Sequence, residues 1–132
     1  MDEKNRLDAF AAEHGISMTA DLRDSNPHVP ESGTMDHWRV TLRHAGRTYT
    51  LTFSRGLGFN GAPPSVGEVL GCFAADSVYS DTTFEEWCAD LGFDSDSRKA
   101  ERTYKAVVDQ TERARRLLGE HVWAALMCEA AS

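Results

Sequence analysis

Residues 37 to 53 read HWRVTLRHAGRTYTLTF, and this stretch decides the fold. Apolar and polar residues alternate on both sides of the dipeptide Ala45-Gly46, as they do in strands with one buried face. Two such runs around a glycine turn predict a β-hairpin. Because alanine disfavours a positive φ, a turn slightly longer than two residues is the alternative to a tight one. The side chains expected on the buried face are those of Trp38, Val40, Leu42, Tyr49, Leu51 and Phe53.

The residues before the hairpin add a helix and a third strand. Leu7, Phe10 and Ala11 have the spacing of one helix face, and Gly15 is expected to end that helix. Residues 16–22 then alternate in the same way as the hairpin strands. They predict a three-stranded antiparallel meander, whose first two strands are joined by a loop rich in turn-forming residues.

Helical spacing replaces alternation after the hairpin. Ser65 and Thr83 each stand three residues before a glutamate, which is the pattern of a capping box at a helix start. A long helix is expected from Asp94 or Ser95, with an interruption at Gly119 and a last short helix behind it. The helices therefore follow the sheet as one group.

The order of these elements predicts a single α+β domain over residues 1–132. The domain contains a three-stranded antiparallel sheet, an N-terminal helix and a C-terminal group of about four helices that cover one face of the sheet. A chain of this length can bury a core without disulfides or metals.

A glycine-rich stretch between sheet and helices raises the possibility of a nucleotide site. Residues 54–65, SRGLGFNGAPPS, contain G-x-G-x-x-G, the nominal fingerprint of a dinucleotide-binding loop. That motif needs a parallel strand before it and a helix that begins inside it. Here the strand belongs to an antiparallel hairpin, and Pro63 and Pro64 separate the glycines from the helix. We therefore interpret the stretch as a strand-to-helix connection without a cofactor.

Residue types that serve catalysis or metal binding are present, but no motif brings them together. The five histidines form no H-x-x-x-H pair, and Cys72, Cys88 and Cys128 are widely spaced. We expect these cysteines to be reduced, buried packing residues. We expect no catalytic, metal-binding or cofactor-binding residue and no enzyme activity; a small enzyme whose site assembles only in the fold is an alternative.

Two features of the chain predict where it resides. No apolar stretch is long enough to span a membrane, and the acidic, polar N-terminus lacks the features of a signal peptide. We therefore expect a cytoplasmic protein without a membrane partner.

Charge is distributed unevenly along the chain, whose net charge is −7. No lysine or arginine occurs from residue 56 to residue 97. A wholly acidic segment repels nucleic acid and favours a basic protein partner. The candidate partner-binding residues are Asp81, Glu85, Glu86, Asp90, Asp94 and Asp96.

A basic segment follows the acidic one directly. Residues 98–118 carry seven lysines and arginines against three acids. Cations on one side of a helix can contact phosphates, so a nucleic-acid-binding accessory protein is the alternative function. In an acidic protein this interpretation is the less favoured one. Its candidate residues are Arg98, Arg102, Lys105, Arg113 and Arg116.

Residues 82–119, TTFEEWCADLGFDSDSRKAERTYKAVVDQTERARRLLG, resemble an element found in small proteins of bacteriophages, prophages and plasmids. The pattern consists of Phe84 and Trp87, then GFD, then DSRKAE and Tyr104. The stretches DSNP and SRGLGFNGAPPSVGEVLGCFAADS are also similar to such proteins, so the resemblance covers residues 16–119.

This group of proteins is largely uncharacterised and includes inhibitors of host defence, among them anti-CRISPR proteins. The resemblance implies a non-enzymatic protein that acts in the bacterial host cell by binding and inhibiting a host defence protein. The acidic segment would then mimic nucleic acid toward a nucleic-acid-handling defence complex. No catalytic residue is implied by the resemblance.

Overall fold

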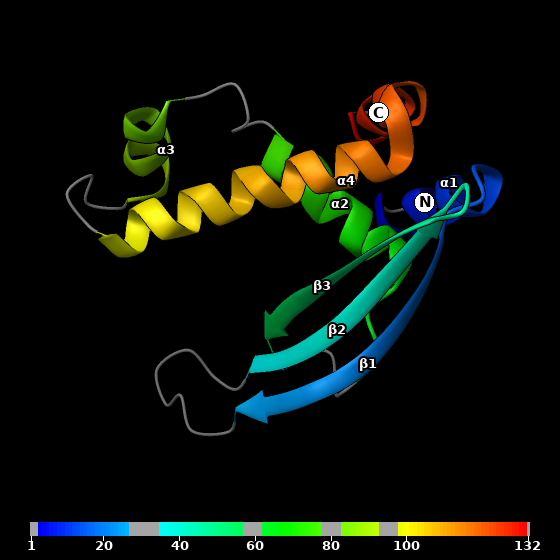
Figure 1. Cartoon of the computed structure of the whole chain (residues 1–132), viewed down its shortest axis with the longest axis horizontal. Helices are drawn as coiled ribbons and strands as arrows, with labels where there is room; N and C mark the ends of the chain where they lie inside the picture. The colour runs from blue at the N-terminus through cyan, green and yellow to red at the C-terminus, as the bar shows by residue number, and fades with distance from the viewer. Residues whose placement is uncertain (1–2, 27–34, 57–61, 78–82, 93–97, 132) are drawn as a thin grey trace.

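The computed structural model describes residues 3–26, 35–56, 62–77, 83–92 and 98–131. The elements follow one another in the order α1 (Glu3–Glu13), β1 (Ser17–Asn26), β2 (Met35–His44), β3 (Arg47–Gly56), α2 (Val66–Ser77), α3 (Phe84–Leu91) and α4 (Arg98–Ala130). The predicted α+β class is confirmed, with the N-terminal helix, the antiparallel sheet and the C-terminal helices in the expected order (Figure 1).

The hairpin forms around the tight two-residue turn and not around the longer alternative. The sheet has the order β1-β2-β3, both pairings are antiparallel, and His44 pairs with Arg47. The turn therefore contains Ala45 and Gly46 alone, with φ angles of 51° and 79°. The alternative of a longer turn is wrong: two left-handed residues match the twist of the strands they join, and this match outweighs the cost of about 1–2 kcal/mol at the alanine.

The first two strands extend beyond the predicted alternation. β1 continues to Asn26 and β2 begins at Met35, and the register between these strands shifts by one residue at Arg23. Backbone pairing does not require alternating side chains, so the apolar pattern underestimates the strand length.

The two faces of the sheet differ in character. The outer face is polar and is cross-linked between strands: the Thr41 and Thr50 hydroxyls lie 3.0 Å apart, and His37 Nδ1 lies 2.7 Å from Ser54 Oγ. The inner face of β2 is buried beneath the helices at Trp38, Val40 and Leu42, as the alternation predicted.

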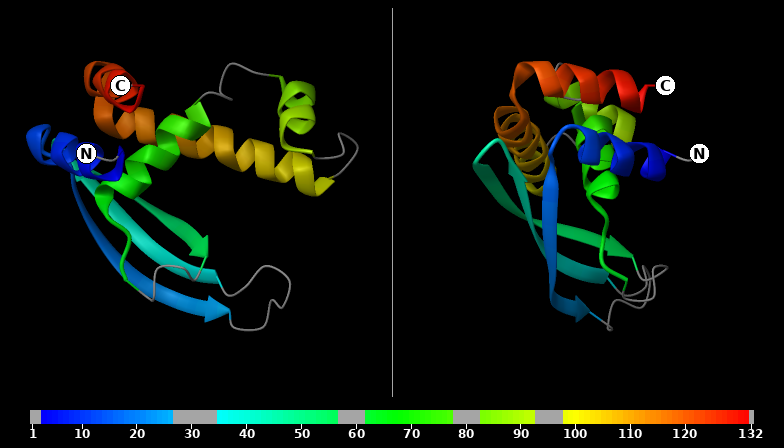
Figure 2. Two further views of the ribbon diagram at one scale, coloured as in Figure 1. Left: turned by 180° about the vertical axis from the view of Figure 1, so that it is seen from behind. Right: turned by 90° about the vertical axis from the view of Figure 1, so that its right-hand side faces the viewer.

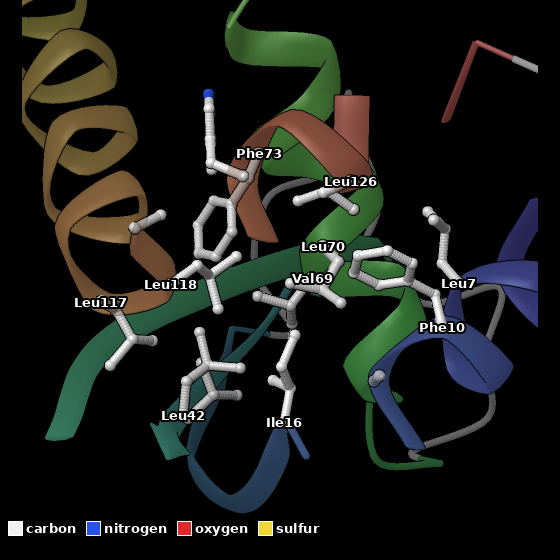
Figure 3. Packing of buried hydrophobic residues seen from close by; sticks show 14 of the residues in the cluster. Leu7, Phe10, Ile16, Leu42, Val69, Leu70, Phe73, Leu117, Leu118 and Leu126 are labelled. Atoms are coloured by element: carbon white, nitrogen blue, oxygen red, sulfur yellow. The ribbon is translucent and has the colours of Figure 1, made fainter. Parts of the chain in front are cut away.

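Helices α1, α2 and α4 cover the inner face of the sheet (Figures 1 and 2). Their apolar side chains meet those of the strands in one core, which Figure 3 shows from close by. The core contains Leu7 and Phe10 from α1, Val69, Leu70 and Phe73 from α2, and Ala114, Leu117, Leu118, Trp123 and Leu126 from α4. The end of α4 lies beside α1, where Arg6 donates to the carbonyl of Glu129.

The two predicted capping residues open their helices. Ser65 Oγ accepts from the amide of Glu68, and Thr83 Oγ1 accepts from the amide of Glu86, each at 3.2 Å. Gly92, with φ 75°, ends α3 in the left-handed conformation that favours glycine.

Helix α4 contains the predicted interruption. Gly119 has φ 82° and ψ 160°, which are not helical angles, so the last two predicted helices form one kinked element. Helix α3 packs on α4, which lies between α3 and the sheet, rather than covering the sheet itself (Figure 1).

The cysteine prediction is partly wrong. Cys72, Cys88 and Cys128 form no disulfide, but Cys88 alone among them is buried. Helical spacing placed all three beside apolar neighbours, yet Cys72 and Cys128 face away from the core. The glycine-rich loop and the predicted start of the long helix, residues 57–61 and 93–97, lie outside the described residues.

Candidate nucleic-acid interface

A stripe of cations follows one side of α4. Residues 98, 102, 105, 113 and 116 lie within about 80° of one another around a straight α-helix, over an axial length of about 27 Å. All five side chains are exposed, because the opposite side of α4 packs into the core. We call this surface the basic stripe: Arg98, Arg102, Lys105, Arg113 and Arg116.

Carboxylates neutralise part of the basic stripe. Lys105 Nζ lies 2.8 Å from Glu101 Oε1, and Arg113 Nε lies 2.9 Å from Asp109 Oδ2. The hydrogen bond from Lys105 and its charge lower the pKa of Glu101. Among the described residues, the other three arginines of the stripe make no ion pair.

A pocket opens where the end of the stripe meets the sheet. It has a volume of about 490 Å³ and lies between the start of β3 and the middle of α4. Three guanidinium groups, one carboxylate and one phenol border it. Its lining residues are Arg47, Thr48, Tyr49, Asp109, Arg113, Arg116 and Leu117.

Two side chains of this pocket differ in exposure: Arg47 is exposed and Tyr49 is partly buried. The guanidinium of Arg47 lies at the α4 kink, with Nη2 3.9 Å from the place that a Cβ on Gly119 would occupy. Burial raises the pKa of the Tyr49 phenol; the charge of Arg113 opposes this effect and that of Asp109 adds to it. The hydroxyl of Tyr49 can donate a hydrogen bond.

The sequence alone did not reveal the pocket. Arg113 and Arg116 were among the predicted site residues, but Arg47, Tyr49 and Asp109 were not. One signal was present: Arg47 has the same strand phase as the apolar Tyr49, Leu51 and Phe53, so it is a cation on the inner face. Which helix faces it depends on tertiary packing.

The predicted acidic surface is only partly described. Glu85, Glu86 and Asp90 are exposed on α3, and among the described residues none of them forms an ion pair. The other candidates, Asp81, Asp94 and Asp96, lie outside the described residues.

The remaining described acids of that segment lie on a different helix. Glu68 is in the first turn of α2, and Asp76 is in its last turn, where burial raises the pKa of the carboxyl group. The negative charge of the segment is therefore divided between α2 and α3.

The described residues form neither a metal site nor a membrane-spanning helix. No group of three or more His, Cys, Asp or Glu side chains is placed to hold a metal ion. Among the same described residues, no helix combines the length and the apolar character that crossing a membrane requires. Comparisons of the chain with protein-family models, with curated proteins and with solved structures find no match.

Proposed function

We propose that the protein binds nucleic acid through the phosphate backbone, with the basic stripe as the contact surface. The observation that carries this proposal is the convergence of five exposed cations on one side of one helix. Asp109 is the one carboxylate within the arc of the stripe, and Glu101 and Glu112 border it. A duplex presents a charge about every 1.7 Å along its axis, so a stripe about 27 Å long meets several phosphates at once.

The acidic character of the rest of the molecule is compatible with this function. Charges separated by more than a Debye length, about 10 Å at 0.1 M salt, are largely screened in solution. Helix α3 packs on the first turns of α4, so we expect its acids Glu85, Glu86 and Asp90 to weaken the field at the start of the stripe more than at its far end. Phosphate contacts carry no sequence information, so we expect binding that does not depend on base sequence.

Salt dependence tests the proposal. A labelled duplex of about 20 base pairs should bind more weakly as the salt rises from about 50 to 200 mM, with a logarithmic slope of about −3 to −4. Such a slope corresponds to about four displaced counterions, close to the number of cations in the stripe. Fluorescence anisotropy measures the affinity at each salt concentration.

Charge reversal locates the contact. Arg102→Glu and Arg116→Glu should each weaken duplex binding by about tenfold, because each removes a phosphate contact and adds a repulsive charge. Lys4→Glu is the matched control, since it makes the same charge change at an exposed position in the first turn of α1. Equal losses in all three variants, or a slope near zero, would contradict a contact at the basic stripe.

A second function is favoured by a different observation. Glu85, Glu86 and Asp90 are exposed on one short helix and have no cationic partner among the described residues. This arrangement supports the proposal of an inhibitor that binds a basic host defence protein. A contact of this kind would involve α3 and leave the basic stripe free.

A further inference from the structure

The pocket beside β3 contains a cation that does not belong to the basic stripe. Arg47 comes from the first residue of β3, and it borders the same space as Arg113 and Arg116 of α4. Three guanidinium groups from two elements thus surround one pocket. The stripe needs no such cavity, because a duplex backbone contacts an open surface.

The charge in the pocket fits a doubly charged anion. Asp109 offsets one of the three arginines, which leaves a local charge of about two positive units. A phosphate monoester carries about −1.5 to −2 near neutral pH, whereas each internal phosphate of a strand carries one negative charge. The planar fork of an arginine also matches phosphate geometry with two parallel hydrogen bonds.

Two of the lining side chains offer hydrogen-bond donors to such a ligand. Asp109 binds Arg113 through Nε, and this pairing leaves the terminal nitrogens of that guanidinium for another acceptor. Tyr49 lines the same pocket and supplies a hydroxyl donor there. The volume of about 490 Å³ exceeds that of a phosphate group and accommodates an attached sugar.

We propose that the pocket formed by Arg47, Arg113, Arg116 and Tyr49 binds a phosphate monoester. Two sources supply this chemistry: the phosphorylated end of a nucleic-acid strand, and a free nucleotide. The strand-end source rests on the proposed function, because the basic stripe would hold the adjoining backbone. The free nucleotide does not depend on it.

The test compares ligands that differ in the terminal phosphate. Labelled strands of about ten nucleotides with a 5′-phosphate, a 3′-phosphate or neither are titrated by anisotropy, and thymidine 5′-monophosphate and thymidine are titrated by calorimetry. We expect a phosphorylated form to bind about tenfold more tightly than its unphosphorylated counterpart. Arg47→Gln should reduce the ratio of the two affinities, phosphorylated over unphosphorylated, to near one. Arg39→Gln changes an arginine on the outer face of the sheet and should leave this ratio unchanged.

The variants also separate this proposal from the proposed function. If Arg102→Glu has no effect but Arg47→Gln abolishes the preference for nucleotide over nucleoside, the pocket binds a free phosphomonoester and the stripe does not bind strands. If the strands bind with a salt slope but none of the phosphorylated forms is preferred, the pocket proposal is overturned and the proposed function stands. Arg47 and Arg116 are exposed, so Arg116→Gln gives a second folded variant, which is expected to lower the ratio as well.

Discussion

Replacing Gly67 with alanine is expected to lower the free energy of unfolding by about 2–3 kcal/mol. A Cβ on Gly67 would overlap the backbone carbonyl of Lys4 and would lie 2.6 Å from Asp8 Oδ1 and 2.8 Å from Asp8 N. Two of these atoms belong to the backbone of α1, so a side-chain rotation cannot relieve the overlap. The helices would have to separate, which would also weaken the hydrogen bond of 2.6 Å from Gly67 N to Asp8 Oδ1. This loss exceeds the gain of about 1 kcal/mol that alanine has over glycine in a helix.

Chemical denaturation of the wild type and of Gly67→Ala measures the difference in their free energies of unfolding. Gly71→Ala is the matched control, because Gly71 lies one turn later in α2 and is partly exposed, whereas Gly67 is buried. There the added methyl group should be neutral or stabilise the fold by up to about 1 kcal/mol through helix propensity. Equal stabilities for wild type and Gly67→Ala would show that α1 and α2 do not approach as closely as the structure places them.

Replacing Trp87 with alanine is expected to release α3 from α4 without unfolding the rest of the domain. Trp87 is 2% exposed and packs in a small cluster separate from the main core. Its ring lies 5.4 Å from that of Tyr104 and 6.4 Å from that of Phe84. Removing a buried tryptophan costs about 3–5 kcal/mol, and an eight-residue helix has little stability of its own.

Hydrogen exchange with site resolution measures this local opening. The amides of α3 should lose their protection in Trp87→Ala, while those of β2 and α2 keep theirs. Phe73→Ala provides the contrast, because Phe73 belongs to the main core and its loss should lower protection throughout the domain. A uniform loss of protection in Trp87→Ala would mean that the two clusters unfold as one unit.

Most of the fold could be predicted because its signals are local. Alternation around Ala45-Gly46 predicts the hairpin, and Ser65 and Thr83 form the caps that their spacing indicates. Gly119 interrupts α4 because its backbone takes a positive φ. Each of these features depends on residues close together in the sequence.

The features that could not be predicted depend on packing between distant segments. Nothing near Gly67 in the sequence indicates that α1 lies against it, and nothing near Arg47 indicates that Arg113 and Arg116 face it. The basic stripe itself was predictable, because its residues follow the period of one helix. The pocket at the end of the stripe was not predictable, because it forms only where β3 and α4 pack side by side.

The proposed contact with nucleic acid is tested most directly by titrating a short duplex into the protein and following the backbone amide NMR signals of the protein. Binding through the basic stripe predicts that the shifted signals cluster in residues 98–116 of α4 and at residues 47–49 of β3, and that raising the salt reverses the shifts. Shifts confined to α3 or to the outer face of the sheet, or a spectrum unchanged by the duplex at low salt, would contradict it.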